Sequence, residues 1–385
     1  MVRVIIVGVG GIGAMAAWQL AQAGHEVVAL EQFSLDHDRG SSYGDSRIVR
    51  RVYADALYTA LMADAYPLWD TLQAQFPDEE LFRRAGGIFF GPADHPQVRA
   101  AQEALETSQV EYEALGPAAC ARRFPAVVLQ PEEVALYEPS MGYARASLCV
   151  RAAATLARRY GAQIREETAV AAIQTGPGGQ GVRVTTPHGE NLEADRLLLT
   201  SGPWLGPLLE SLGVTLPLAV TRQPYVHLLP DSHAADFEVG RFPVWIDAVV
   251  EAYGFPRMGA LPGVKIGLHR GGAAATPENV DRNVHEEDYA GPRRYAARRF
   301  PWLSPQVAYA KVCLYTNTPD EDFLIDSVPG LPDVFLLGGC SGHGFKFTPL
   351  LGRIGAALAA GAPVPYDLSR FRLARFASNQ AALYT

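Results

Sequence analysis

The first thirty residues show two hydrophobic patterns in turn. Residues 3–7 (RVIIV) are a short, β-branched apolar run, which predicts a buried strand. Residues 12–23 are rich in alanine and predict a helix that ends at Gly24, because glycine readily follows the last turn of a helix. Residues 26–30 predict a second strand, which ends at Glu31. The chain therefore opens with a β–turn–α–β unit.

The pattern changes character twice further along the chain. Helical and strand-like segments alternate up to residue 217 and again after residue 333, with predicted helices at 55–75, 150–160 and 349–360 and predicted strands at 87–91, 169–173, 182–186, 196–200 and 334–337. Strand-like runs dominate between them, at 224–229, 242–246, 252–255 and 264–269. This order predicts an α/β Rossmann-like domain interrupted by an α+β domain with a large, mainly antiparallel sheet.

Composition and charge narrow the function classes. The 385 residues are enough for two or three domains, and the net charge of −8 disfavours a nucleic-acid partner. The four cysteines, none in CxxC spacing, indicate neither a disulfide framework nor a metal site. Residues 4–24 are uncharged and long enough to span a bilayer, but they contain five glycines and two glutamines. We therefore expect a cytoplasmic protein without a membrane or nucleic-acid partner.

A glycine motif lies between the first predicted strand and helix. Gly8, Gly10 and Gly13 form GxGxxG, and Glu31 follows 18 residues after the last glycine. In such motifs the first glycine permits a tight turn, the second lets the backbone approach a pyrophosphate, and the third lets the helix pack closely on the strand. The helix N-terminus attracts phosphates, and Glu31 can accept hydrogen bonds from a ribose. The motif predicts NAD or FAD, and the acid makes NADP less favourable.

Four later segments distinguish between these cofactors. They are residues 40–51 (GSSYGDSRIVRR), 252–256 with 265–269 (AYGFP and KIGLH), 312–316 with 320–326 (VCLYT and DEDFLID), and 338–347 (GGCSGHGFKF). Together they resemble the family of monomeric sarcosine oxidase, N-methyltryptophan oxidase and pipecolate oxidase, within the D-amino-acid-oxidase-like flavoproteins. The resemblance extends from Val4 to the neighbourhood of Phe376. It implies an FAD-dependent amine oxidase in which residues 1–83, 146–217 and 323–385 bind FAD and residues 84–145 and 218–322 bind substrate.

The resemblance implies that FAD is held covalently. The family attaches the flavin 8α-methyl group to a cysteine, and Cys313 occupies that position; a thiolate is a competent nucleophile for such a bond. Thr348 and Pro349 are expected at the N-cap and first turn of the last helix, whose N-terminus would favour an anionic reduced flavin. The resemblance places further residues beside the cofactor: Ser42, Arg47, Gly342, Gly344 and Lys346. The two glycines are expected to let the backbone approach the flavin ring.

The resemblance also assigns the substrate site. By resemblance, Arg50 and Lys346 together bind the substrate carboxylate. The guanidinium group of arginine can donate two parallel hydrogen bonds to a carboxylate, and the ammonium group of lysine adds a point charge. The resemblance puts Lys265 over the flavin where oxygen reacts, and it lines the substrate cavity with Tyr253, His269 and Tyr315. Lys265 and His269 share one face of a predicted strand but would lie about 13 Å apart, too far to act as a dyad.

Other residues of these segments have less certain roles. Arg47, Arg50 and Arg51 would share a face if they lay on a helix, and we expect only a structural role for Arg51. The role of His343 stays open. Tyr43 stands where family members commonly have histidine, which changes the size of the cavity and removes a group that titrates near neutral pH.

The sequence thus predicts an oxidase of small secondary α-amino acids such as sarcosine, another N-methyl amino acid, pipecolate or proline. The products would be an imine, then an aldehyde or oxo compound, and hydrogen peroxide. Its partners would be the amino acid and molecular oxygen, and we expect a monomer. Three alternatives remain open: a flavin dehydrogenase with another acceptor, an NAD-dependent dehydrogenase, and a non-catalytic FAD-binding subunit. Lys265, Cys313 and the glycine-rich loop argue against them.

Overall fold

A six-stranded sheet forms one half of the molecule. The computed structural model describes residues 1–376, and its first sheet has the order β20-β21-β13-β1-β2-β9. All neighbours are parallel except the edge pair of β20 and β21. The strands are β1 (Arg3–Val7), β2 (Glu26–Leu30), β9 (Gln163–Arg165), β13 (Arg196–Leu199), β20 (Leu324–Val328) and β21 (Leu331–Gly338). The predicted β–turn–α–β unit is thereby confirmed.

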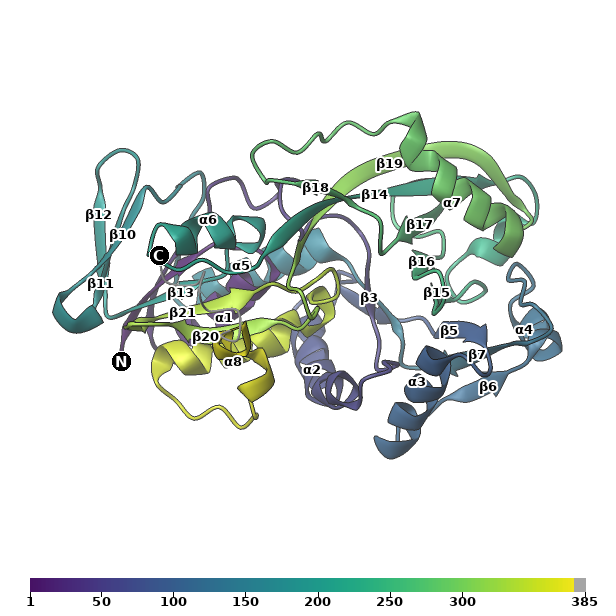
Figure 1. Cartoon of the computed structure of the whole chain (residues 1–385), viewed down its shortest axis with the longest axis horizontal. Helices are drawn as coiled ribbons and strands as arrows, with labels where there is room; N and C mark the ends of the chain where they lie inside the picture. Colours follow the sequence, from purple (N-terminus) through teal and green to yellow (C-terminus); the bar gives the residue numbers. More distant parts are fainter. Residues whose placement is uncertain (377–385) are drawn as a thin grey trace.

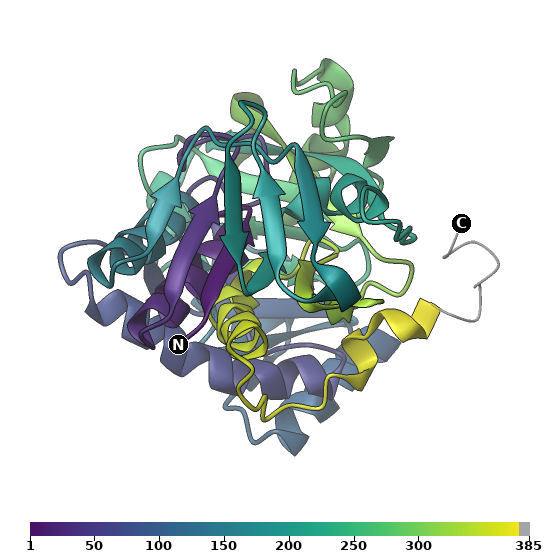
Figure 2. The same cartoon turned by 90° about the vertical axis from the view of Figure 1, so that its left-hand side faces the viewer.

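Both faces of this sheet are covered (Figures 1 and 2). Val4 and Ile6 pack against one hydrophobic cluster, which the helices build, while Ile5 and Val7 point to the opposite cluster. The helices of the first cluster are α1 (Gly11–Gln22), α2 (Ala56–Ala74), α5 (Ala146–Arg159) and α8 (Thr348–Ala360). The other face is covered by α6 (Leu205–Glu210) and by a three-stranded sheet of β10 (Ala172–Thr175), β11 (Val182–Thr185) and β12 (Asn191–Ala194). Burial on both faces explains why β1 is apolar at successive positions.

A nine-stranded sheet forms the other half, at the right of Figure 1. Its strands are β5 (Gly87–Pro92), β6 (Glu113–Leu115), β7 (Glu133–Glu138), β14 (Ala219–Pro230), β15 (Val244–Asp247), β16 (Ala252–Phe255), β17 (Val264–Leu268), β18 (Ala273–Ala275) and β19 (Leu303–Asn317). Only β15 and β5 pair in parallel, so the predicted mainly antiparallel sheet is confirmed. The helices of this half are α3 (Pro96–Thr107), α4 (Pro117–Arg123) and α7 (Glu286–Arg299).

A small sheet carries the first of the predicted site arginines. It consists of β3 (Arg47–Val49), β8 (Gly142–Ala144) and β4 (Phe82–Arg84) in the order β3-β8-β4. The β-branched residues Ile48 and Val49 suit a strand, and β3 pairs antiparallel with β8. Arg47, Arg50 and Arg51 therefore do not share the face of a helix.

The uncharged stretch of residues 4–24 folds as β1, the glycine turn and α1. Among residues 1–376, the structure contains no helix that is long and apolar enough to cross a membrane.

Candidate active site

Two cavities meet between the halves of the molecule. One has a volume of about 420 Å³ and reaches the glycine turn after β1, and the other, of about 510 Å³, reaches under β16 and β17. Both are lined by the same residues where they meet: Arg47, Cys313, Tyr315, Gly342 and Phe345. A ligand that fills the first cavity would therefore present one end to the second.

The glycine turn has the geometry that its motif predicts. Gly8 has a φ of +94°, and a Cβ on Gly13 would lie 2.0 Å from the carbonyl oxygen of Gly8, so neither position accepts a side chain. At Gly10 the nearest atom to such a Cβ would be Ser42 Oγ at 3.4 Å, which leaves the turn open to the cavity. Ser42 Oγ also accepts a 3.1 Å hydrogen bond from the amide of Gly11, at the start of α1. The turn thus leaves room for a phosphate at a helix N-terminus.

Glu31 is fixed at the end of β2. Its carboxylate accepts hydrogen bonds from the amides of Val9 (2.9 Å) and Phe33 (3.1 Å), and His37 Nε2 lies 3.6 Å away. The residue is only 5% exposed and lines the first cavity. The structure therefore holds this carboxylate where a ribose hydroxyl could donate to it.

Three buried hydroxyls in the first cavity have no hydrogen-bond partner among residues 1–376. They are Ser201 Oγ, Thr316 Oγ1 and Thr348 Oγ1. Since buried polar groups are normally paired, these orphans fit a cavity built for a large polar ligand such as FAD. Thr348 is not the N-cap of α8, as the sequence suggested; Phe347 takes that position, and Thr348 begins the helix.

The glycines of the loop after β21 pack against protein atoms. A Cβ on Gly342, whose φ is +77°, would lie 2.3 Å from the Tyr315 ring, and one on Gly344 would lie 2.4 Å from Cys340 Cβ. Both residues line the first cavity. Glycine at these positions permits the contact of the loop with β19 and with itself, and the expected approach of the flavin ring to the same glycines stays a prediction.

Cys313 lies on β19 at the junction of the cavities. Its Sγ is 3.8 Å from Arg47 Nη2, and Arg47 is itself held by hydrogen bonds of 2.8 Å to the carbonyls of Ser41 and Ser46. Tyr43 was expected to change the size of the cavity but lines neither cavity; it is 7% exposed and donates a short hydrogen bond to the carbonyl of Val312. It therefore anchors β19 beside the cysteine.

Arg50 and Lys346 line the second cavity together. Lys346 is 5% exposed, and its Nζ donates to the hydroxyl of Tyr53 at 2.7 Å and to the carbonyl of His343 at 2.6 Å. Arg50 donates to the carbonyl of Val52, and its guanidinium lies 4.0 Å from the centre of the Tyr53 ring. Burial lowers the pKa of Arg50, and burial together with Arg50 holds the pKa of Lys346 well below its ordinary value.

Arg51 has a structural setting, as expected. Its backbone amide donates to the buried carboxylate of Glu138, and its guanidinium lies 5.0 Å from the centre of the Tyr66 ring.

Lys265 is buried on β17 at the opposite side of the second cavity. It is 4% exposed, and its Nζ donates to Ser46 Oγ at 3.1 Å and lies 4.1 Å from the centre of the Tyr225 ring. Burial, followed by the charge of Arg47, holds the pKa of Lys265 well below its ordinary value. Among residues 1–376 this ammonium forms no ion pair, and a buried cation of this kind is a means of stabilising negative charge.

Tyr253, His269 and Tyr315 line the same cavity as Lys265. The rings of His269 and Tyr315 are 5.3 Å apart, and burial lowers the pKa of His269. β17 ends at Leu268, so His269 follows the strand that carries Lys265. The structure therefore brings every site residue implied by the resemblance to one or both cavities.

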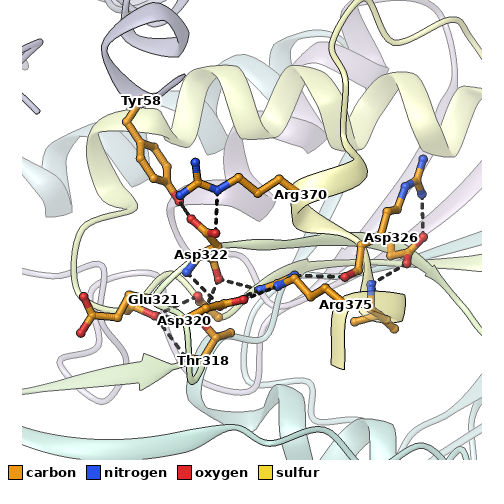
Figure 3. Close-up of polar contacts among 12 residues, drawn as sticks. Tyr58, Thr318, Asp320, Glu321, Asp322, Asp326, Arg370 and Arg375 are labelled. Atoms are coloured by element: carbon orange, nitrogen blue, oxygen red, sulfur yellow. Dashed lines mark hydrogen bonds and ion pairs between the residues drawn. The ribbon is translucent and has the colours of Figure 1, made fainter. Parts of the chain in front are cut away.

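Charged residues that the sequence did not single out line part of the second cavity or pack behind its lining. Arg270 bridges Glu251 and Glu321, each at 2.7 Å. Figure 3 shows how Asp322 accepts hydrogen bonds from Tyr58 (2.7 Å) and Arg370 (2.7 Å). Arg372 and Arg375 bind Asp326 and Asp320 in the same way. The DEDFLID segment is thus held by arginines near the C-terminus, and these residues gave no signal beyond their charge.

Comparisons with known proteins identify the family of this chain. A model of the family described as FAD dependent oxidoreductase matches residues 3–358. The chain is 35% identical over 384 residues to the monomeric sarcosine oxidase of Streptomyces avermitilis, covering 98% of each chain. It is 32% identical over 382 residues to the peroxisomal sarcosine oxidase of Homo sapiens, covering 97% of this chain and 96% of that one.

Solved structures show the same fold. That of NikD, described as an unusual amino acid oxidase essential for nikkomycin biosynthesis, has a TM-score of 0.84 at 25% identity and covers 96% of this chain and 97% of that one. Matches over nearly the full length confirm the resemblance carried by the motifs, and the chain belongs to the FAD dependent oxidoreductase family.

Proposed function

We propose that this protein is an FAD-dependent oxidase of small secondary α-amino acids, such as sarcosine, another N-methyl amino acid, pipecolate or proline. The observation that supports it most directly is the pair of Arg50 and Lys346 in a cavity that borders Cys313 and the FAD cavity. Among residues 1–376 neither cation is paired with a carboxylate, and two such cations suit a carboxylate ligand. The amine of the same ligand would then lie toward the junction of the cavities.

The residues have separable tasks in this reaction. FAD, when bound, supplies the acceptor of the two electrons that leave the C–N bond of the substrate. Arg50 and Lys346 hold the carboxylate, while the rings of Tyr253 and Tyr315 exclude water from the amine. Lys265 stabilises the negative charge that develops on oxygen. The substrate leaves as an imine, which water hydrolyses to an aldehyde or oxo product, and oxygen leaves as hydrogen peroxide.

We further propose that Cys313 holds the flavin through a thioether bond to its 8α-methyl group. The position of Sγ at the junction of the cavities supports this, because a ligand that fills the first cavity would end beside it. Ser42, Gly342, Gly344 and Lys346 would lie around the bound cofactor.

We also propose a cytoplasmic monomer, in which residues 1–83, 146–217 and 323–385 bind FAD and residues 84–145 and 218–322 bind substrate. The six-stranded and nine-stranded sheets draw their strands from segments that agree with this division.

A panel of N-methyl and cyclic amino acids tests the proposed function. Oxygen uptake and peroxide formation should be stoichiometric with a preferred substrate, and the methyl ester of that substrate should react poorly. Reduction of an artificial electron acceptor without oxygen uptake would show a dehydrogenase instead.

A further inference from the structure

Tyr53 lies between the two cations that the proposed function assigns to the substrate carboxylate. The residue is 8% exposed. One face of its ring carries the guanidinium of Arg50 at 4.0 Å, and its hydroxyl accepts a 2.7 Å hydrogen bond from Lys346 Nζ. Both contacts are favourable to a cation that is shielded from water. A single side chain thus touches both members of the pair.

His343 determines which way the Tyr53 hydroxyl points. The hydroxyl lies 3.3 Å from Nδ1 of His343, and Nε2 of the same ring lies 3.0 Å from the carbonyl oxygen of Glu321. A carbonyl only accepts, so the network assigns the ring proton to Nε2 and leaves Nδ1 as an acceptor. Burial, followed by the charge of Lys346, holds the pKa of His343 well below its ordinary value, so the ring is neutral near pH 7. The Tyr53 proton therefore faces His343, and its oxygen lone pairs face Lys346.

We propose that Tyr53 is a positioning residue, which aims one N–H of Lys346 and the unused donors of Arg50 at the substrate carboxylate. An ammonium has three N–H donors, and two of those on Lys346 are taken by the Tyr53 hydroxyl and the His343 carbonyl. Arg50 uses Nη1 for the carbonyl of Val52. One lysine donor and the remaining guanidinium edge are left, which matches one carboxylate. This inference rests on the proposed function, because it concerns the same site.

The charge of Lys346 depends on the groups around it. These are Arg50 and Tyr53 after β3, His269 after β17, and Cys340 and His343 on its own loop. Burial and Arg50 already lower the pKa of Lys346. Loss of the Tyr53 oxygen removes an acceptor that favours the charged form, so the pKa of Lys346 should fall further. Carboxylate binding should then be lost at a lower pH.

Acetate titrations of the holoenzyme test this role, with flavin absorbance as the signal and pH as the variable. Tyr53→Phe keeps the ring under Arg50 and removes only the hydroxyl. We expect acetate to bind about tenfold more weakly or worse, as for loss of a charged hydrogen bond, and the alkaline limit of binding to move to lower pH. Acetamide, which has no charge, should bind the variant and the wild type alike.

Tyr58→Phe is the matched control. Its ring stacks on Tyr53 with centroids 5.3 Å apart, but its hydroxyl donates to Asp322 and not to the cation pair. This variant should keep the acetate affinity and pH limit of the wild type. If the two tyrosines have only a structural role, both variants should lose acetate affinity equally, and that result would overturn the inference. Unchanged acetate binding in Tyr53→Phe would also overturn it.

A second variant covers the case in which Tyr53→Phe does not fold. His343→Leu removes the acceptor of the Tyr53 proton, so the alkaline limit of acetate binding should again move to lower pH, and an unchanged limit would refute the role. Failure of the proposed function is distinguishable. If acetate binds as described but no amino acid yields peroxide, the proposed oxidase activity is refuted and the role of Tyr53 is not. If the wild type binds acetamide more tightly than acetate, the carboxylate site is refuted, and the role of Tyr53 is refuted with it.

Discussion

Replacement of Lys265 by methionine tests where oxygen reacts. The lysine is 4% exposed, and its Nζ is held by Ser46 Oγ at 3.1 Å and by the Tyr225 ring at 4.1 Å. Methionine has a similar length and no charge, so the cavity keeps nearly the same volume while the cation is lost. Arg50 and Lys346, which we propose as the carboxylate ligands, lie on other segments. Flavin reduction by substrate should therefore change little.

The oxidative half-reaction should slow strongly. Oxygen acquires negative charge when it takes its first electron, and a fixed cation stabilises that charge without rearrangement of water. At an effective dielectric constant of ~20, a unit charge about 4 Å from the ammonium gains about 4 kcal/mol. Each 1.4 kcal/mol corresponds to about tenfold in rate, so we expect reoxidation to become about 100–1,000-fold slower.

Stopped-flow absorbance separates the two half-reactions. Reduction is followed anaerobically with substrate, and the reduced protein is then mixed with oxygenated buffer. Lys311→Met is a suitable control, because Lys311 is half-exposed, pairs with Asp38 and lines neither cavity. A Lys265→Met variant that is reoxidised at the wild-type rate would refute the reasoning.

The same lysine predicts a pH dependence. Burial and Arg47 lower the pKa of Lys265, so the cation is lost at a lower pH than for a free lysine. Reoxidation by oxygen should accordingly be fast below that pKa and slow as the pH rises through it. The Lys265→Met variant should lack this alkaline decline.

Three further substitutions test the rest of the site. Cys313→Ala should leave a flavin that acid precipitation removes, and a pellet as yellow as that of the wild type would contradict the thioether bond. Arg50→Ala should weaken acidic substrates ~10–150-fold while sparing their methyl esters, and equal losses in KM would show that Arg50 does not bind the carboxylate. Gly13→Ala should yield protein without FAD or with a lower Tm, because its Cβ would lie 2.0 Å from the carbonyl oxygen of Gly8; normal FAD content and Tm would contradict this.

The elements with a strong local pattern were predicted closely. The strand expected at 3–7 is β1. The helix expected at 12–23 is α1, which begins and ends one residue earlier, and the helix expected at 349–360 is α8, which begins one residue earlier. The three-residue strands β3, β4 and β8 could not be predicted, because pairing across the chain decides such short segments. α7 was missed because it contains Pro292 and seven charged side chains in a polar run with few apolar positions, although its acidic first turn and basic last turn are typical of a helix.

Some residues of the candidate site could be predicted from a local motif, some only from the family resemblance, and some not at all. Gly8, Gly13 and Glu31 lie within one local motif, so their geometry followed from spacing alone. The pairing of Arg50 with Lys346 came from the family resemblance, since no local rule joins residues that far apart. Tyr53 was missed for the same reason, because its bond to Lys346 spans 293 positions. The ion pairs of Arg270 with Glu251 and Glu321 could not be predicted either, because they join three loops that are separate in the sequence.

The charge distribution gives an independent argument for the kind of ligand. The chain carries a net charge of −8, yet its second cavity is lined by Arg47, Arg50, Lys265 and Lys346, which are buried or half-buried. Burial lowers the pKa of Arg50, Lys265 and Lys346, which means that the folded protein holds these cations at a cost in free energy. An anion that enters the cavity offsets this cost, whereas a neutral ligand does not. This cost agrees with the proposal that Arg50 and Lys346 bind a carboxylate while Lys265 stabilises the negative charge that develops on oxygen.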